Sequence, residues 1–302
     1  MLRRKLLLEE PEIINAHSSY VIDVLFTPDS QLLISSGMDN IINMWSVPEW
    51  KLKGALIGHT HSVNSIALTP DANTLVSGST DKTLRLWSLP EGKEIMTLKG
   101  HRKTVSCVNI SPDGEYIVSG SYTGKVKIWS LQTGEEFTII NALDRNVSTS
   151  VFLPDGKTLS VSGINNDILI YELPSSKVIN KLSGHKTAVT ALSISKGGKY
   201  HASSGYDKTV KLWRIKDWEI IQDFTLDSEG YFRSAFSPDS KTLALVAAYK
   251  VMIWSVETGE TLTGQSLKPK GLTSVTFSPD GQWLAVGAAD KKIRLWKMNS
   301  LI

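Results

Sequence analysis

The sequence predicts an all-β protein folded as a seven-bladed β-propeller with four antiparallel strands in each blade. Three observations predict this class: a recurring aromatic residue, a recurring proline turn, and the lack of helical periodicity. The aromatic residues are Trp45, Trp87, Trp129, Tyr171, Trp213, Trp254 and Trp296, spaced by 42 residues except for 41 between the fifth and the sixth. The prolines are Pro28, Pro70, Pro112, Pro154, Pro238 and Pro279, and Lys196 holds the missing fifth position.

Each repeat contains four short strands separated by turn residues. In the second repeat, the alternating segment 63–70 predicts the first strand, and the turn 71–74 leads to the second strand at 75–79. The tight turn 80–82, the third strand 83–89, the turn 90–93 and the fourth strand 94–100 follow. An isolated four-stranded sheet is marginally stable, whereas a ring of such sheets buries both faces of each.

The two ends of the chain predict how the ring closes. Only six residues follow Trp296, too few for the outer strand of the seventh blade. Residues 4–15 occupy the place that residues 93–100 hold before His101, and they are not needed by the first blade. We therefore expect the N-terminal segment to supply the outer strand of the last blade, which makes residues 1–302 one propeller.

The composition is that of an ordinary globular chain, with 41% hydrophobic and 21% charged residues and a net charge of +3. Cys107 is the single cysteine, which excludes an intramolecular disulfide and favours a reducing compartment. The apolar run near the N-terminus ends at once in "EEPE", so it is too short for a secretory signal. No segment approaches the ~18 apolar residues of a transmembrane helix. We expect a cytoplasmic protein with no membrane partner.

A histidine, a serine and an aspartate recur in register with the aromatic residue, and these residue types also form hydrolytic triads. Three repeats carry the full set: His17, Ser35, Asp39 and Trp45; His59, Ser77, Asp81 and Trp87; His185, Ser203, Asp207 and Trp213. The third repeat keeps His101, Ser119 and Trp129 but has Thr123 in place of the aspartate, and the sixth has Asp227 in the histidine position. A triad predicts one site with an exposed nucleophile, and no G-x-S-x-G elbow occurs. The repeated set instead predicts a buried hydrogen-bond network, because a buried Trp N–H needs an acceptor.

The sequence lacks the other common catalytic and ligand-binding motifs. Gly156-Lys157-Thr158 lacks the earlier glycine of a phosphate-binding loop, and there is no H-E-x-x-H motif or cysteine cluster. We therefore predict no catalytic residue, no cofactor and no metal, and we expect that the protein is not an enzyme. A catalytic group in the central channel of the propeller remains an alternative.

The repeat motifs resemble those of the WD40 repeat family. The resemblance rests on "GH" before first strands, on "SPDG" turns, and on an Asp followed by Lys or Arg, Ile or Leu, and Trp, and it covers residues 5–296. The family's Asp after the Trp is absent here, since Ser, Arg or Lys follows each of the six tryptophans that end a repeat. The resemblance implies that the matching His, Ser, Asp and Trp form a buried hydrogen-bond chain. It also implies a non-catalytic scaffold for protein–protein interaction.

The resemblance further implies a binding face, formed by the loops before the first strands and the turns between second and third strands. Register assigns to this face Tyr20, Ile22, Met38, Thr80, Thr104, Tyr122, Ile164, Tyr206 and Phe232, with Arg102, Lys103 and Lys186 in the surrounding loops. An apolar centre with a cationic rim favours a protein or peptide partner that carries an apolar anchor flanked by acidic residues. We expect the ring to act as a monomer or as a subunit of a larger complex. Nucleic acid or another polyanion on the basic rim is the alternative, which the modest net charge disfavours.

Overall fold

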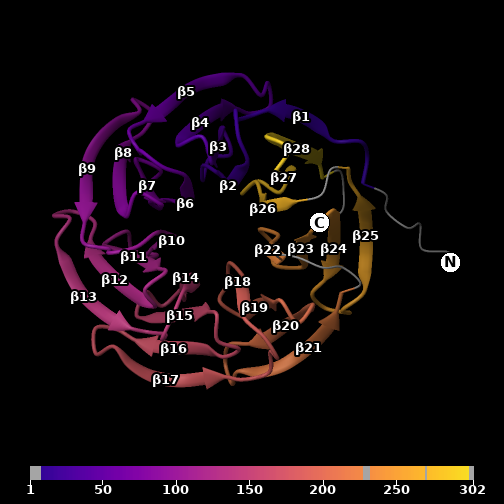
Figure 1. The fold of residues 1–302 in the computed structure, drawn as a ribbon. Coiled ribbons are helices and arrows are strands. Elements are labelled where there is room, and N and C mark those ends of the chain that lie inside the picture. The colour runs from indigo at the N-terminus through magenta and orange to yellow at the C-terminus, as the bar shows by residue number, and fades with distance from the viewer. Residues whose placement is uncertain (1–7, 227–231, 269–270, 299–302) are drawn as a thin grey trace.

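The structure is a computed structural model that describes residues 8–226, 232–268 and 271–298. Seven antiparallel sheets of four strands each stand around a central axis, and the ring in Figure 1 is closed. In each blade the first strand lines the centre and the fourth forms the circumference. The predicted fold class is therefore confirmed.

The strands follow the repeat from blade to blade. Blade 1 contains β2 (Val21–Phe26), β3 (Leu32–Gly37), β4 (Ile41–Ser46) and β5 (Leu52–Ile57). Blade 2 contains β6 (Val63–Leu68), β7 (Thr74–Ser79), β8 (Thr83–Ser88) and β9 (Lys93–Lys99), and blade 3 contains β10 (Val105–Ile110), β11 (Tyr116–Ser121), β12 (Lys125–Ser130) and β13 (Glu136–Asn141). Blade 4 contains β14 (Val147–Phe152), β15 (Thr158–Gly163), β16 (Ile168–Glu172) and β17 (Lys177–Leu182). Blade 5 contains β18 (Val189–Ile194), β19 (Tyr200–Gly205), β20 (Thr209–Arg214) and β21 (Glu219–Thr225). Blade 6 contains β22 (Phe232–Phe236), β23 (Thr242–Ala247), β24 (Lys250–Ser255) and β25 (Thr261–Ser266).

Blade 7 joins the two ends of the chain. Its strands are β26 (Leu272–Phe277), β27 (Trp283–Ala288), β28 (Lys292–Lys297) and β1 (Glu12–Asn15), which pairs antiparallel with β28. Ile14 lies opposite Ile293 and is buried, and the Ala16 N–H donates to the Lys291 carbonyl at 3.0 Å. The N-terminal strand thus closes the ring as the sequence predicts.

The hydrophobic core lies between neighbouring blades. The middle strands are buried on both faces, so β7 and β11 read as nearly continuous small and apolar residues. Val76 and Leu84 of blade 2 pack with Val105 and Trp129 of blade 3, and similar clusters join the other blades. Since each blade buries its faces against its neighbours, stability accumulates around the ring. Within the described residues, no helix has the length and apolar character needed to cross a bilayer.

Blade 6 differs from the other blades in the register of its inner strand. In the other six blades one residue of the inner strand, such as Ile22 between Val21 and Asp23, is left out of the pairing as a β-bulge. Strand β22 pairs with β23 without this bulge, and Phe232 lies opposite Ala247. The turn between β23 and β24 contains two residues, against three in blade 5, which accounts for the single 41-residue spacing.

Candidate protein-interaction face

The ring has two faces with different loops. We call upper face the one formed by the loops before the first strands and by the turns between second and third strands. The lower face carries the turns between first and second strands and those between third and fourth strands. The residues that the sequence assigned to binding lie on these loops and turns, except Ile22 and Phe232, which lie in strands β2 and β22.

In blades 1, 2 and 5, which have the full set of His, Ser, Asp and Trp, a chain of hydrogen bonds joins the upper-face loop to the core of the blade. In blade 5, His185 Nδ1 lies 3.1 Å from Asp207 Oδ2, and His185 Nε2 lies 2.9 Å from Ser203 Oγ. Trp213 Nε1 donates to the same Ser203 Oγ at 2.9 Å. Blades 1 and 2 repeat this geometry with the residues that the sequence singles out there: His17, Asp39, Ser35 and Trp45; His59, Asp81, Ser77 and Trp87. We call this arrangement the polar chain.

The polar chain has one consistent direction of donation. The indole N–H can only donate, and the serine oxygen accepts it. An ionised carboxylate can only accept, so a neutral histidine donates its Nδ1–H to the carboxylate and accepts the serine hydroxyl at Nε2. Burial lowers the pKa of His185 more than Asp207 raises it, which keeps the ring neutral. Burial opposes ionisation of Asp207, but hydrogen bonds from the Lys186 N–H and from Thr209 outweigh it and lower the carboxyl pKa. In blade 5 the network is therefore satisfied with a neutral His185 and an ionised Asp207.

The same geometry argues against a hydrolytic triad. Each serine of the polar chains is fully buried, at 0% exposure for Ser35, Ser77, Ser119 and Ser203. Its hydroxyl also holds the indole N–H, so no substrate carbonyl has access to it. The polar chain acts as a brace between the loop and the blade.

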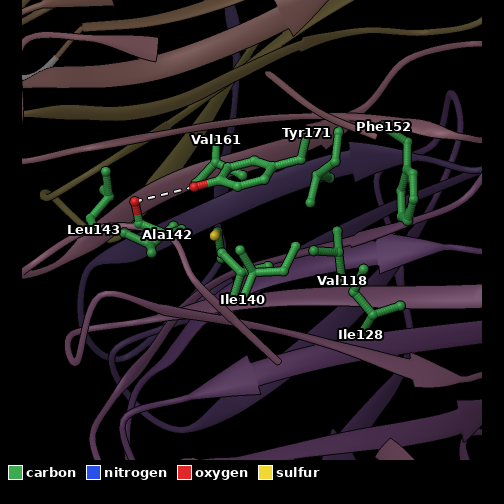
Figure 2. Close-up of a cluster of buried hydrophobic side chains, with 12 residues drawn as sticks. Val118, Ile128, Ile140, Ala142, Leu143, Phe152, Val161 and Tyr171 are labelled. Atoms are coloured by element: carbon green, nitrogen blue, oxygen red, sulfur yellow. Dashed lines mark hydrogen bonds between the residues drawn. The ribbon is translucent and has the colours of Figure 1, made fainter. Parts of the chain in front are cut away.

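Blades that lack one or more of the His, Ser, Asp and Trp residues form other hydrogen bonds at these positions. In blade 3, His101 Nε2 lies 2.7 Å from Ser119 Oγ, which accepts from Trp129 Nε1 at 2.8 Å. Burial, with a smaller contribution from Lys127, lowers the pKa of His101 to about 4. In blade 4, the Tyr171 hydroxyl donates to the Ala142 carbonyl at 3.3 Å above a purely apolar cluster, as Figure 2 shows.

Blades 6 and 7 depart further. In blade 7, Arg294 pairs with Asp290 at 2.7 Å, and Trp296 Nε1 donates to Gln265 Oε1 at 3.1 Å. In blade 6, the Trp254 indole N–H is buried and has no acceptor among the described residues. Asp227, which the sequence places in the histidine position of that blade, lies outside the described residues.

The structure brings the predicted upper-face residues together in pairs. The Met38 N–H donates to the Tyr20 carbonyl at 2.8 Å, and the Tyr122 N–H donates to the Thr104 carbonyl at 3.1 Å. The same bond joins Thr80 to Ser62, Ile164 to Asn146, Tyr206 to Ala188 and Ala289 to Gly271. Five large side chains are left exposed at these pairs: Tyr20, Met38, Tyr122, Ile164 and Tyr206. Thr80 and Thr104 are half-buried, as is Ile22 on its bulge.

The prediction that Phe232 takes part in binding is wrong. Its side chain is 0% exposed and belongs to the core between blades 5 and 6. Without the bulge, Phe232 moves into the buried register position that Val189 holds in blade 5. The missing turn residue in blade 6 is visible in the sequence, but the loss of the bulge depends on strand pairing.

The upper-face loops also carry exposed cations. Arg102 and Lys103 follow the blade 3 histidine, and Lys186 follows the blade 5 histidine. The Lys186 N–H donates to Asp207 Oδ2 at 2.7 Å, which fixes the backbone while the ammonium group remains in solvent. The cations therefore stand in the loops whose carbonyl groups accept from the Tyr122 and Tyr206 N–H groups.

The central channel contains charged residues that the sequence analysis did not select. Asp23 of β2 accepts from the Ser274 hydroxyl at 2.9 Å and from the Ile66 N–H at 3.1 Å, which links blades 7, 1 and 2. Arg233 of β22 lines the same cavity of about 220 Å³ and donates to the Thr190 carbonyl at 2.9 Å. Burial raises the pKa of Asp23 despite these hydrogen bonds. The sequence offered one signal for them: Asp23 and Arg233 are charged, whereas the same repeat position holds a small residue in the other five blades: Ser65, Cys107, Thr149, Ala191 and Ser274.

Among the residues that the structure describes, no three His, Cys, Asp or Glu side chains are grouped as metal ligands. Cys107 is buried, and burial raises its thiol pKa. Its sulfur lies 3.4 Å from Ser150 Oγ beside the channel. The buried thiol is therefore protonated and poorly accessible.

The structure is a closed ring of seven four-stranded sheets, with polar chains between loops and blades and with exposed apolar residues on one face. These features define a repeat β-propeller, a class of protein that commonly binds other proteins. The chain belongs to the WD40 family: the family model described as "WD domain, G-beta repeat" matches residues 9–46, 50–88, 92–130, 176–214 and 258–297, more than half of the chain. The matched segments leave out the repeats that end at Tyr171 and Trp254, which are blades 4 and 6. Propellers of this family typically bind proteins.

A curated relative matches over a shorter stretch. The chain is 31% identical to "Protein hir1" of Schizosaccharomyces pombe over an alignment of 72 residues, and the alignment covers 22% of this chain and 8% of that protein. The match thus spans a small part of the relative. This sequence identity supports a shared WD40 repeat and does not indicate a shared role.

Proposed function

We propose that this chain is a non-catalytic scaffold that binds protein partners on the upper face of its propeller. One observation carries the proposal: Tyr20, Met38, Tyr122, Ile164 and Tyr206 stand 42 to 48% exposed at register positions of the upper face. Each is held by a backbone hydrogen bond to or from the paired loop. Large apolar side chains on fixed backbone lose little entropy on binding, and such residues are enriched at interface centres.

The surrounding charge supports a partner of a particular chemistry. Arg102, Lys103 and Lys186 are exposed in the loops whose carbonyl groups accept from the tyrosine N–H groups of blades 3 and 5. A peptide with an aromatic or aliphatic anchor would cover the tyrosines, and flanking Asp or Glu residues would meet the cations. The exposed apolar residues fall in two groups, at blade 1 and over blades 3 to 5, because blade 2 presents Ser62, Asn64 and Thr80.

The exposed cations also support the alternative of a polyanion partner. The two partners differ in their response to salt. Polyanion binding should weaken log-linearly and steeply with salt concentration, because counterions are released. A peptide interface with an apolar centre should change by only a few-fold between low and physiological salt.

The test compares matched alanine variants by affinity capture and quantitative mass spectrometry. We expect Tyr20→Ala with Met38→Ala, or Tyr122→Ala with Tyr206→Ala, to reduce captured partner by about tenfold or more. The control is Ile57→Ala with Ile95→Ala, which removes side chains that are 74% and 52% exposed on the outer strands. Full retention of every partner by both upper-face variants would refute the proposed face, and loss in the control alone would place binding on the circumference.

A further inference from the structure

The lower-face turns between first and second strands are built alike in six blades. Each contains an aspartate directly after the proline position: Asp29, Asp71, Asp113, Asp155, Asp239 and Asp280. In all six, the aspartate Oδ1 accepts the backbone N–H of the second residue after it at 2.9 to 3.0 Å. In five of them a Ser or Thr hydroxyl two residues before it also donates to Oδ1, at 2.5 to 2.7 Å. Each turn therefore holds a carboxylate at a fixed place.

The blade 5 turn keeps this backbone but not the aspartate. Gly197 stands in the aspartate position, and Lys196 replaces the proline. The Gly198 N–H donates to the Ser195 carbonyl at 2.8 Å, and φ of Gly198 is 66°, close to the 60° of Ser30 in blade 1. The turn has the same shape, so the position of the carboxylate is preserved although no side chain supplies one.

The donors that would bind that carboxylate are still present. Ser195 Oγ accepts the Tyr200 N–H at 2.9 Å, as the equivalent hydroxyl does in blade 1, but no aspartate receives the Ser195 proton. No described residue accepts a hydrogen bond from the Lys199 N–H, which occupies the place of the N–H that binds the aspartate elsewhere. A Cβ on Gly197 would meet no atom within 4 Å, so the space beside these donors is open.

The surroundings of the turn are cationic and concave. A groove of about 960 Å³ between blades 5 and 6 is lined by Lys196, Lys199 and Lys241, with Asp239 and Glu257 as its acidic residues. Lys241 pairs with Asp239 at 3.2 Å, whereas the Lys199 ammonium lies over the Tyr200 ring at 5.0 Å from its centroid. Lys196 and Lys199 thus stand on either side of the open turn and favour an anion there.

We propose that the blade 5 turn is a carboxylate-binding site that receives an Asp or Glu side chain of a partner peptide lying in the groove between blades 5 and 6. The partner's carboxylate would accept from the Lys199 N–H and from Ser195 Oγ, as the chain's own aspartates do in other blades. Lys196 and Lys199 supply charge, and the preformed turn avoids an ordering cost on binding. The site lies on the lower face, so it is independent of the proposed upper-face function and gives the ring a second binding surface.

The test uses the full chain and a fluorescein-labelled hexaglutamate peptide, with hexaglutamine as the uncharged probe. Fluorescence anisotropy measures affinity, and amide NMR shifts locate binding. We expect hexaglutamate to bind and to shift the Lys199 amide, and hexaglutamine to do neither.

The decisive variant is Gly197→Asp, which supplies the carboxylate from within the chain. It should weaken hexaglutamate binding about tenfold and by itself move the Lys199 amide in the direction that the peptide does. Gly197→Ala adds a side chain without charge and should change the affinity by less than about threefold. Because the other blades carry Asp here, Gly197→Asp should leave the melting temperature equal or higher, which excludes misfolding as the cause.

Several results would overturn the proposal. It fails if Gly197→Asp binds hexaglutamate like the wild type, or if the peptide shifts upper-face amides and leaves Lys199 unchanged. It also fails if inorganic phosphate shifts the Lys199 amide while hexaglutamate does not, because the site would then select phosphate rather than a carboxylate. Loss of binding in Arg102→Ala with Lys103→Ala, without loss in Gly197→Asp, would assign the acidic peptide to the upper face.

Discussion

Blades 5 and 6 are neighbours with the same strand order, yet they hold their central tryptophan by different means. In blade 5, Trp213 is bound through Ser203 and His185 to Asp207. In blade 6, Leu245 stands in the serine position, and Trp254 instead packs against Phe224 with ring centroids 4.0 Å apart. The space around the tryptophan of a propeller blade can therefore be filled either by a polar hydrogen-bond chain or by apolar packing.

The largest loss of stability should come from a substitution in blade 6, where packing is apolar. Phe232→Ala removes a fully buried ring from the core between blades 5 and 6, so we expect the free energy of unfolding to fall by about 3–5 kcal/mol. Urea denaturation followed by tryptophan fluorescence measures the loss. The control is Met38→Ala on the exposed face, which should cost less than about 0.5 kcal/mol. A small effect of Phe232→Ala would mean that the residue is not buried in solution.

Blade 5, which contains a complete polar chain, should lose stability when a single hydroxyl is removed. Ser203→Ala leaves the Trp213 N–H and His185 Nε2 without their shared partner, so we expect a loss of about 1–3 kcal/mol in the free energy of unfolding. Ser204→Ala is a closely matched control, because Ser204 is the next residue of β19, is equally buried, and its hydroxyl has no partner among the described residues.

Ser204→Ala should change the free energy by less than about 0.5 kcal/mol. Equal costs for the two variants would show that hydrogen bonding by the serine does not brace the blade. Chemical denaturation of both variants under one set of conditions decides between these results.

Acid should destabilise blade 5 more than blade 6, and the effect should be confined to the strands near one buried histidine. Burial lowers the pKa of His201 in β19 to about 3, from 6.5 in the unfolded chain, and no histidine occurs in β22 to β25. The unfolded chain therefore binds a proton that the folded chain does not, and stability falls as pH drops from about 6.5 towards 3. Hydrogen exchange, corrected for intrinsic rates, should show β19 amides losing more protection than β23 amides between pH 7 and pH 5. The same loss in both strands would contradict a local origin.

Much of the fold could be predicted because the repeat keeps its residues in register. Ser77 lies 18 residues after His59 and 10 before Trp87, and these spacings return in blades 1, 3 and 5. Because every blade has the same antiparallel pairing, residues with the same spacing occupy equivalent positions in each blade. The hydrogen-bonded partners can therefore be predicted from the sequence. The outer strand β1 followed in the same way, because the seventh repeat lacked its fourth strand.

The number of blades, the closure of the ring and the members of the polar chains follow from the sequence alone, because they depend on a local period. The burial of Phe232 is apparent only in the folded chain, since its position depends on whether β22 contains a bulge. The same holds for the contact of Asp23 with Ser274, a residue 251 positions away, and for the place of Lys199 on the lining of an open groove. Such features arise where neighbouring blades meet, and pairing between distant strands, rather than the repeat, places the atoms there.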